Sequence, residues 1–172
     1  MQVTIHTFPP VCLAGASFFG NPFTSHAAWT EENEIGLLWQ RYLSLLREQS
    51  PPSRENDPPG EAFKEEFFEL HILHPGSNLR GEYEVFAGHP VQFSEIARWP
   101  LPFSLKVIPP GEYGLFWLNG PDAAEDWAAE LELPEGYRLN TSFSVLRYDH
   151  RFRGMDQLEE SQVQIHAPLL RH

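Results

Sequence analysis

The sequence contains little cysteine and little positive charge, and each shortage excludes certain classes of structure or function. Cys12 is the single cysteine among 172 residues, so no intrachain disulfide can form and a reducing, cytoplasmic location is expected. Lysine and arginine number 12 against 24 aspartate and glutamate residues, a formal charge of −12. Because affinity for nucleic acids comes mainly from basic side chains at phosphates, direct binding of DNA or RNA is not expected.

Long hydrophobic runs and recognisable catalytic motifs are also missing. No window reaches the roughly 18 apolar residues of a membrane span, and the N-terminal residues lack the pattern of a signal peptide. The eight histidines include no HxxxH helix motif and there is no cysteine pair, so neither a metal nor a cofactor is expected. A GxSxG nucleophile motif and a glycine-rich phosphate loop are absent. We therefore expect a non-enzymatic protein that does not bind membranes.

The patterns that are present predict an α+β fold. Residues 31–49 carry apolar side chains at helical spacing after Thr30, a good N-cap. A tract with four prolines at 50–60 predicts an exposed connection, and prolines argue against regular structure at 93–101. Alternation and turn residues predict strands at 3–7, 11–19, 65–73, 82–88, 105–108, 113–118, 143–148 and 162–167, and a short helix at 121–131.

The order of these elements repeats. A strand, a helix and two further strands are expected at 11–88, and the same series is expected again at 113–167. This predicts one domain, 1–172, made of half-repeats at about 1–90 and 100–172. A seam between two halves is a common place for a small-molecule site.

Four motifs, in this order, carry a resemblance to a known family. They are Leu38-Trp39 in the first helix, IPPGEYGLF at 108–116, YDHRF at 148–152 and VQIHAPL at 163–169. Together they resemble the GyrI-like effector-binding domain, which is the ligand-binding half of multidrug-responsive transcription activators of the BmrR and Rob type. The resemblance spans almost the whole chain.

The resemblance implies a fold and a ligand class. It implies two pseudo-twofold-related halves, antiparallel sheets each backed by a helix, and a cleft between the halves for hydrophobic or aromatic compounds, cationic ones included. In the family a carboxylate two residues before the motif tyrosine often pairs with cationic ligands. Here that position is Leu146, so either the ligand is neutral or another acid compensates. Glu69 and Glu84 are the nearest acids on predicted strands.

The candidate ligand-binding residues follow from the resemblance and from strand alternation. Tyr148 is the strongest candidate because it matches a family aromatic that faces the cleft. Core packing competes with ligand binding for the others, and a one-residue shift of register would reverse a strand residue's face. The full set is Tyr148, Trp39, Tyr42, Leu146, Phe86, Trp117, Glu84 and His166.

The predicted function is that of a stand-alone domain that senses or sequesters a hydrophobic or aromatic compound. Two alternatives stay open. One is a protein-interaction module acting on a partner such as a topoisomerase or a regulator, which a shallow groove and a large apolar patch would favour. The other is a hydrolase of small electrophiles, which a closed cleft with a perturbed carboxylate would favour.

Overall fold

The computed structural model describes residues 1–25, 30–49, 66–124 and 126–172; the connection predicted at 50–60 lies outside this range. The strands are β1 (Thr4–Phe8), β2 (Val11–Gly20), β3 (Phe67–Ile72), β4 (Tyr83–Pro90), β5 (Ser104–Ile108), β6 (Gly111–Asn119), β7 (Tyr137–Leu139), β8 (Phe143–Tyr148) and β9 (Gln162–Arg171). The helices are α1 (Glu34–Gln49) and the short 3₁₀ helices η1 (Ser77–Arg80), η2 (Phe93–Arg98), η3 (Pro121–Ala124), η4 (Trp127–Glu130) and η5 (Met155–Glu160).

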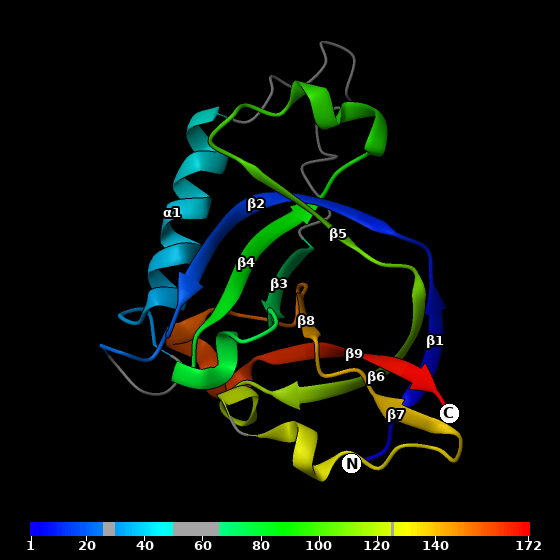
Figure 1. The fold of residues 1–172 in the computed structure, drawn as a ribbon. Helices are drawn as coiled ribbons and strands as arrows, with labels where there is room; N and C mark the ends of the chain where they lie inside the picture. Colours follow the sequence, from blue (N-terminus) through cyan, green and yellow to red (C-terminus); the bar gives the residue numbers. More distant parts are fainter. Residues whose placement is uncertain (26–29, 50–65, 125) are drawn as a thin grey trace.

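The strands form one antiparallel sheet that curls into a half-barrel, with α1 outside β2 and β4 (Figure 1). The strand order is β1-β6-β9-β8-β3-β4-β2-β5, and β7 joins β9. The α+β class is as predicted, but the expectation of separate sheets is wrong. β3 and β8 pair along their whole length, from Phe67 opposite Tyr148 to Ile72 opposite Phe143, and this pairing makes the sheet continuous.

Helix α1 begins three residues later than its pattern predicted. The Asn33 side chain, rather than that of Thr30, caps it, because Asn33 Oδ1 accepts hydrogen bonds from the backbone N–H groups of Ile35 and Gly36. The apolar face of α1 then packs on β2 and β4, where Leu38 and Tyr42 are buried. This packing fixes the position of the other side chains on the first half of α1.

In place of the single short helix predicted at 121–131, the structure has two separate 3₁₀ helices. Within the described part of that segment, η3 and η4 are single 3₁₀ turns, and Asp126 has a non-helical backbone conformation just before η4. A segment this short cannot offset the cost of starting an α-helix unless packing supports it. Trp127 nevertheless packs on Phe116, at 5.4 Å between ring centroids. Residues 93–98, expected to lack regular structure, form η2, and β7 was not predicted.

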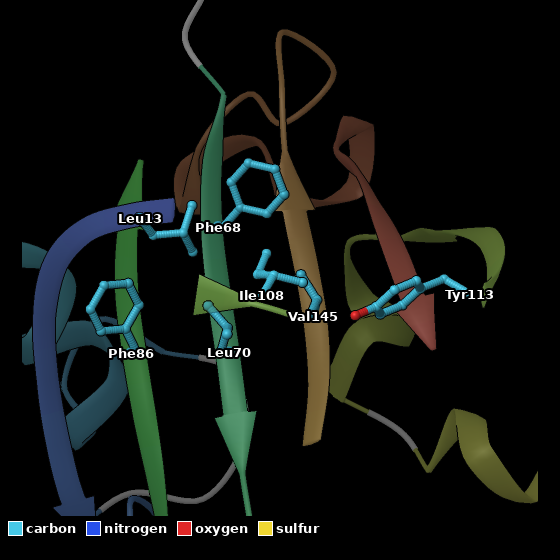
Figure 2. Close-up of a cluster of buried hydrophobic side chains, with 7 residues drawn as sticks. All are labelled: Leu13, Phe68, Leu70, Phe86, Ile108, Tyr113 and Val145. Atoms are coloured by element: carbon cyan, nitrogen blue, oxygen red, sulfur yellow. The ribbon is translucent and has the colours of Figure 1, made fainter. Parts of the chain in front are cut away.

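The core lies on both faces of the sheet. Figure 2 shows side chains from β2, β3, β4 and β8 gathered on the concave face with Ile108 and Tyr113; these residues are Leu13, Phe68, Leu70, Phe86, Ile108, Tyr113 and Val145. Residues of the opposite parity face outward, under α1 on one side and near η4 on the other. In the described part of the chain, no helix combines the length and apolar character that a membrane crossing requires.

Candidate functional site

A cavity of about 1390 Å³ lies at one rim of the sheet, where β6 and β8 end, β3 and β9 begin, and the first half of α1 passes over them. Arg147 and Tyr148 both line it. Because neighbouring side chains on a strand point to opposite faces, the cavity reaches both faces of the sheet at this rim. It therefore has two chemically different ends.

The aromatic end of the cavity is formed by Trp39, Phe67, Tyr148 and Phe152. The Trp39 ring meets Tyr148 edge to face at 5.3 Å and Phe67 at 6.1 Å, and Tyr148 meets Phe152 at 4.9 Å. Such edge-to-face contacts hold aromatic rings in fixed orientations. Ile35 and Leu43 of α1 add apolar surface next to them. This end offers a preformed apolar wall to a ring-containing compound.

Directly behind this wall lies Glu69, which is 2% exposed. Its Oε2 accepts a hydrogen bond of 2.5 Å from Trp39 Nε1 and a longer one of 3.4 Å from the Tyr148 hydroxyl. Its Oε1 lies 2.7 Å from His71 Nε2. These donors offset the cost of burying the carboxylate. Two residues of the aromatic end are thus fixed by one buried acid, which does not itself line the cavity.

Glu69 is the register partner of Leu146 across the β3–β8 pair. Leu146, at the position where the resemblance places a carboxylate, is buried in the outer-face core. The acid therefore sits on the neighbouring strand at the same level of the sheet. Burial and the charge of Glu69 raise the pKa of Tyr148 well above its ordinary value, so its hydroxyl remains a donor at neutral pH.

The arginine end is formed by Arg147, which lies in β8, and by Arg151 and Arg153, which lie in the segment that follows β8. Arg147 pairs with Glu66, donates to Gln164 Oε1 at 2.9 Å and lies 3.4 Å from Asp149. The guanidinium of Arg151 stacks over the ring of Trp117 at 4.2 Å. This end is polar and basic, which neither the sequence patterns nor the resemblance predicted.

Of the predicted site residues, Tyr148, Trp39 and Trp117 line the cavity. Tyr42 is fully buried beside Trp39, at 5.8 Å between rings, and its hydroxyl contacts His89 Nδ1 at 2.6 Å. Leu146 also lies in the core rather than in the lining. These two residues support the aromatic end without facing the cavity.

Three other predicted residues lie elsewhere. Phe86 is fully buried in the concave core. Glu84 is paired with Lys106 at 2.7 Å and with His74 at 2.8 Å, and these contacts hold the pKa of its carboxyl below its usual value despite the burial that opposes them. His166 is buried against Phe8 and reaches Gln164, which does line the cavity, at 3.1 Å.

Two kinds of lining residue were not predicted. Phe67 lies two residues before Glu69 in the strand predicted at 65–73, so alternation places its side chain on the same face as that acid. Arg151 and Arg153 carried no such signal, because their place depends on the path of the chain after β8. Across the described residues no cluster of three or more His, Cys, Asp and Glu side chains could hold a metal ion.

The curled antiparallel sheet with few helices defines an α+β fold. The chain is similar in structure to SAV2435 bound to tetraphenylphosphonium, with 14% identity, a TM-score of 0.57 and 99% and 94% of the two chains covered. It is similar also to the C-terminal domain of EcmrR, with 13% identity, a TM-score of 0.61 and 99% and 98% covered. The chain thus shares its overall fold with these proteins, and the resemblance to GyrI-like domains is confirmed at the level of that fold.

A hydrolase from Listeria innocua shares 11% identity over 98% of this chain and 92% of its own, and its TM-score of 0.48 carries no argument about function. No protein-family model matches the sequence, and no curated protein matches it either. At these identities the comparisons show the fold alone.

Proposed function

We propose that this chain is a small-molecule binding domain that takes a hydrophobic, aromatic compound at the aromatic end of the cavity. The observation that carries the proposal is the set of rings at that end, held against each other and by Glu69. Stacking and apolar burial would supply affinity, since a ring that is fully buried contributes about 2–3 kcal/mol. The volume of about 1390 Å³ is ample for a multi-ring ligand.

The arrangement of the strands supports a site between two half-repeats. β2, β4 and β3 mirror β6, β9 and β8 in the strand order, and the β3–β8 pair joins the two groups. Helix α1 follows β2 as η3 and η4 follow β6. We infer that the two groups are related by a pseudo-twofold axis near the β3–β8 pair, so the cavity lies at the seam of a single domain.

Glu69 is proposed to take over the electrostatic role of the carboxylate that Leu146 lacks. Its charge lies directly behind the electron-rich rings of Trp39 and Tyr148, and both effects favour positive charge on their cavity side. A delocalised hydrophobic cation about 8 Å away would gain about 2 kcal/mol at an effective dielectric constant near 20. This is the chemistry of tetraphenylphosphonium, which SAV2435 binds.

A binding role is proposed in preference to a catalytic one. The two oxygens of Glu69 already accept or adjoin Trp39, Tyr148 and His71, and the carboxylate is closed off from the cavity. A general base must lie within hydrogen-bond reach of the proton that it removes. Glu69 as it stands therefore organises the wall and does not meet a ligand.

The test compares two isosteric hydrophobic ions of opposite charge, tetraphenylphosphonium and tetraphenylborate, by isothermal titration calorimetry. We expect the cation to bind at least about tenfold more tightly. The substitution Glu69→Gln should remove most of this preference. The matched control is Glu84→Gln, which neutralises another buried, paired glutamate away from the cavity and should leave the preference unchanged.

Two results would contradict the proposal in different ways. If neither ion binds and neither raises the melting temperature of the wild-type protein, the aromatic end is not a ligand site. If both bind and Glu69→Gln changes nothing, the cavity binds hydrophobic compounds, but Glu69 has no electrostatic role. A circular dichroism spectrum of each variant establishes that the comparison is between folded proteins.

A further inference from the structure

The arginine end concentrates the scarce positive charge of the chain. Three of the 12 basic residues line the cavity, namely Arg147, Arg151 and Arg153, whereas only three of the 24 acidic residues do so. The molecule as a whole carries −12 and repels anions at long range. That field is screened over about 8 Å at physiological salt, so the charges at the site itself decide what binds there.

The guanidinium of Arg151 is held in place by two neighbouring residues at this end. The Nη1 of Arg151 donates to Asp149 Oδ2 at 3.0 Å, its backbone N–H donates to Asp149 Oδ1 at 3.0 Å, and its Cζ lies over the Trp117 ring, 4.2 Å from the centroid. Within the described residues, no hydrogen-bond acceptor meets its Nε or Nη2. The side chain is 42% exposed and lines the cavity.

The neighbouring charges do not remove this capacity. Asp149 is 8% exposed and is shared, because Arg147 lies 3.4 Å from the oxygen that Arg151 also contacts. Arg147 is occupied by Glu66 and Gln164. Arg153 forms an exposed pair with Glu160, and such pairs contribute little. Of the three arginines at this end, Arg151 is therefore the one whose guanidinium is held by Asp149 and Trp117 while its Nε and Nη2 can still donate to a ligand.

We propose that Arg151 binds the carboxylate of an amphipathic ligand whose aromatic part occupies the aromatic end. A planar guanidinium offers two parallel N–H donors, which match the two oxygens of a carboxylate. Stacking on Trp117 and the bond to Asp149 fix this fork before the ligand arrives, so little conformational entropy is lost on binding. The inference deepens the proposed function and rests on it. It assigns a second group of the same ligand, a carboxylate at the arginine end, in addition to the aromatic part, on which Glu69 favours positive charge.

The experiment uses three compounds with one ring system and one linker: 4-(2-naphthyl)butanoate, 4-(2-naphthyl)butan-1-ol and 4-(2-naphthyl)butan-1-ammonium. Dissociation constants are measured by calorimetry with the full chain. We expect the carboxylate to bind about tenfold more tightly than the alcohol, and the ammonium compound to bind least tightly because Arg151 repels it. Arg151→Gln should bring the carboxylate to the level of the alcohol and leave the alcohol unchanged. Arg151→Lys should restore only part of the difference, because the fork is lost while the charge stays.

The control is Arg98→Gln, which removes the same charge from an arginine of η2 with similar exposure, 46%, that does not line the cavity. It should not alter the order of the three affinities. The inference is overturned if the carboxylate binds no better than the alcohol, or if Arg151→Gln and Arg98→Gln weaken it equally. Failure of the proposed function looks different: none of the three compounds, nor tetraphenylphosphonium, would then bind at all.

Discussion

At the scale of the residue, the hydrogen bonds to Glu69 link the stability of the protein to the shape of its cavity. Trp39 contributes one ring to the cavity wall and one N–H to a carboxylate that is 2% exposed. Removing a partner from a buried charged group costs more than the net value of a hydrogen bond, because the group stays buried. Trp39 should therefore be more sensitive to substitution than its half-buried ring suggests.

A pair of substitutions tests this. Trp39→Phe removes the donor to Glu69 and some ring area, whereas Trp127→Phe removes similar area from a ring that packs on Phe116. We expect Trp39→Phe to lower the free energy of unfolding by about 2 kcal/mol more than Trp127→Phe does. Urea unfolding at pH 7, followed by circular dichroism, measures both. Equal losses would mean that the Trp39–Glu69 bond has no net value for stability.

The residues of the site could be predicted only in part, and the reason is physical. Trp39 and Tyr148 carried family motifs, and both line the cavity. Phe86 and Glu84 lie on β4, none of whose residues lines the cavity, and the place of a strand within the sheet cannot be read from its own alternation. Glu69 could be named as a substitute acid, but its position opposite Leu146 depends on the register of two strands far apart in sequence.

At the scale of the element, local patterns predicted most strands and the long helix. Residues 143–148 form a strand with the predicted limits, and α1 ends at the predicted residue. The prediction failed at 121–131, where a short run of alanines around Trp127 had no long apolar face to support an α-helix. The pairing of β3 with β8, which makes one sheet of the strands, is a tertiary contact and has no local signal.

The close approach of β2 and β4 yields a prediction at this scale. Gly15 and Gly88 are register partners, and a Cβ on Gly15 would lie 2.0 Å from Ala87 O and 2.7 Å from the Phe86 ring. We expect Gly15→Ala to destabilise the protein by about 3 kcal/mol, because the backbone oxygen cannot move without disturbing the strand pair.

The control for this prediction is Gly111→Ala, where the nearest atom, in the Tyr113 ring, lies 3.8 Å from the added Cβ. That change should stay within about 0.5 kcal/mol of the parent. Thermal unfolding, corrected to a common temperature, compares the two proteins. A small effect of Gly15→Ala would show that β2 and β4 can separate by the width of a methyl group without loss of stability.

At the scale of the whole molecule, two buried histidines link the fold to pH. His89 lies under α1 with the Tyr42 hydroxyl on Nδ1, and His166 lies on the concave side between Phe8 and Gln164. Burial lowers the pKa of each to about 4, and Arg147 and His6 add to the effect at His166. They belong to different halves of the sheet order, so both halves respond to acid in the same range.

The sign of the effect follows from proton counting. In the unfolded chain both imidazoles titrate near pH 6.5, so between about pH 6.5 and 4 the unfolded state binds more protons than the folded state. The contribution of the two neutral histidines to the free energy of unfolding is therefore fully present above about pH 6.5. It is lost as the pH falls towards 4, by on the order of 2–3 kcal/mol for each histidine. Urea unfolding at pH 7, 6, 5 and 4 measures how the free energy of unfolding changes with pH.

We expect a double variant, His89→Gln with His166→Gln, to make this dependence flatter. The control His172→Gln, at the exposed C-terminus, should leave it unchanged. A double variant as acid-sensitive as the parent would show that groups other than these two histidines cause the loss.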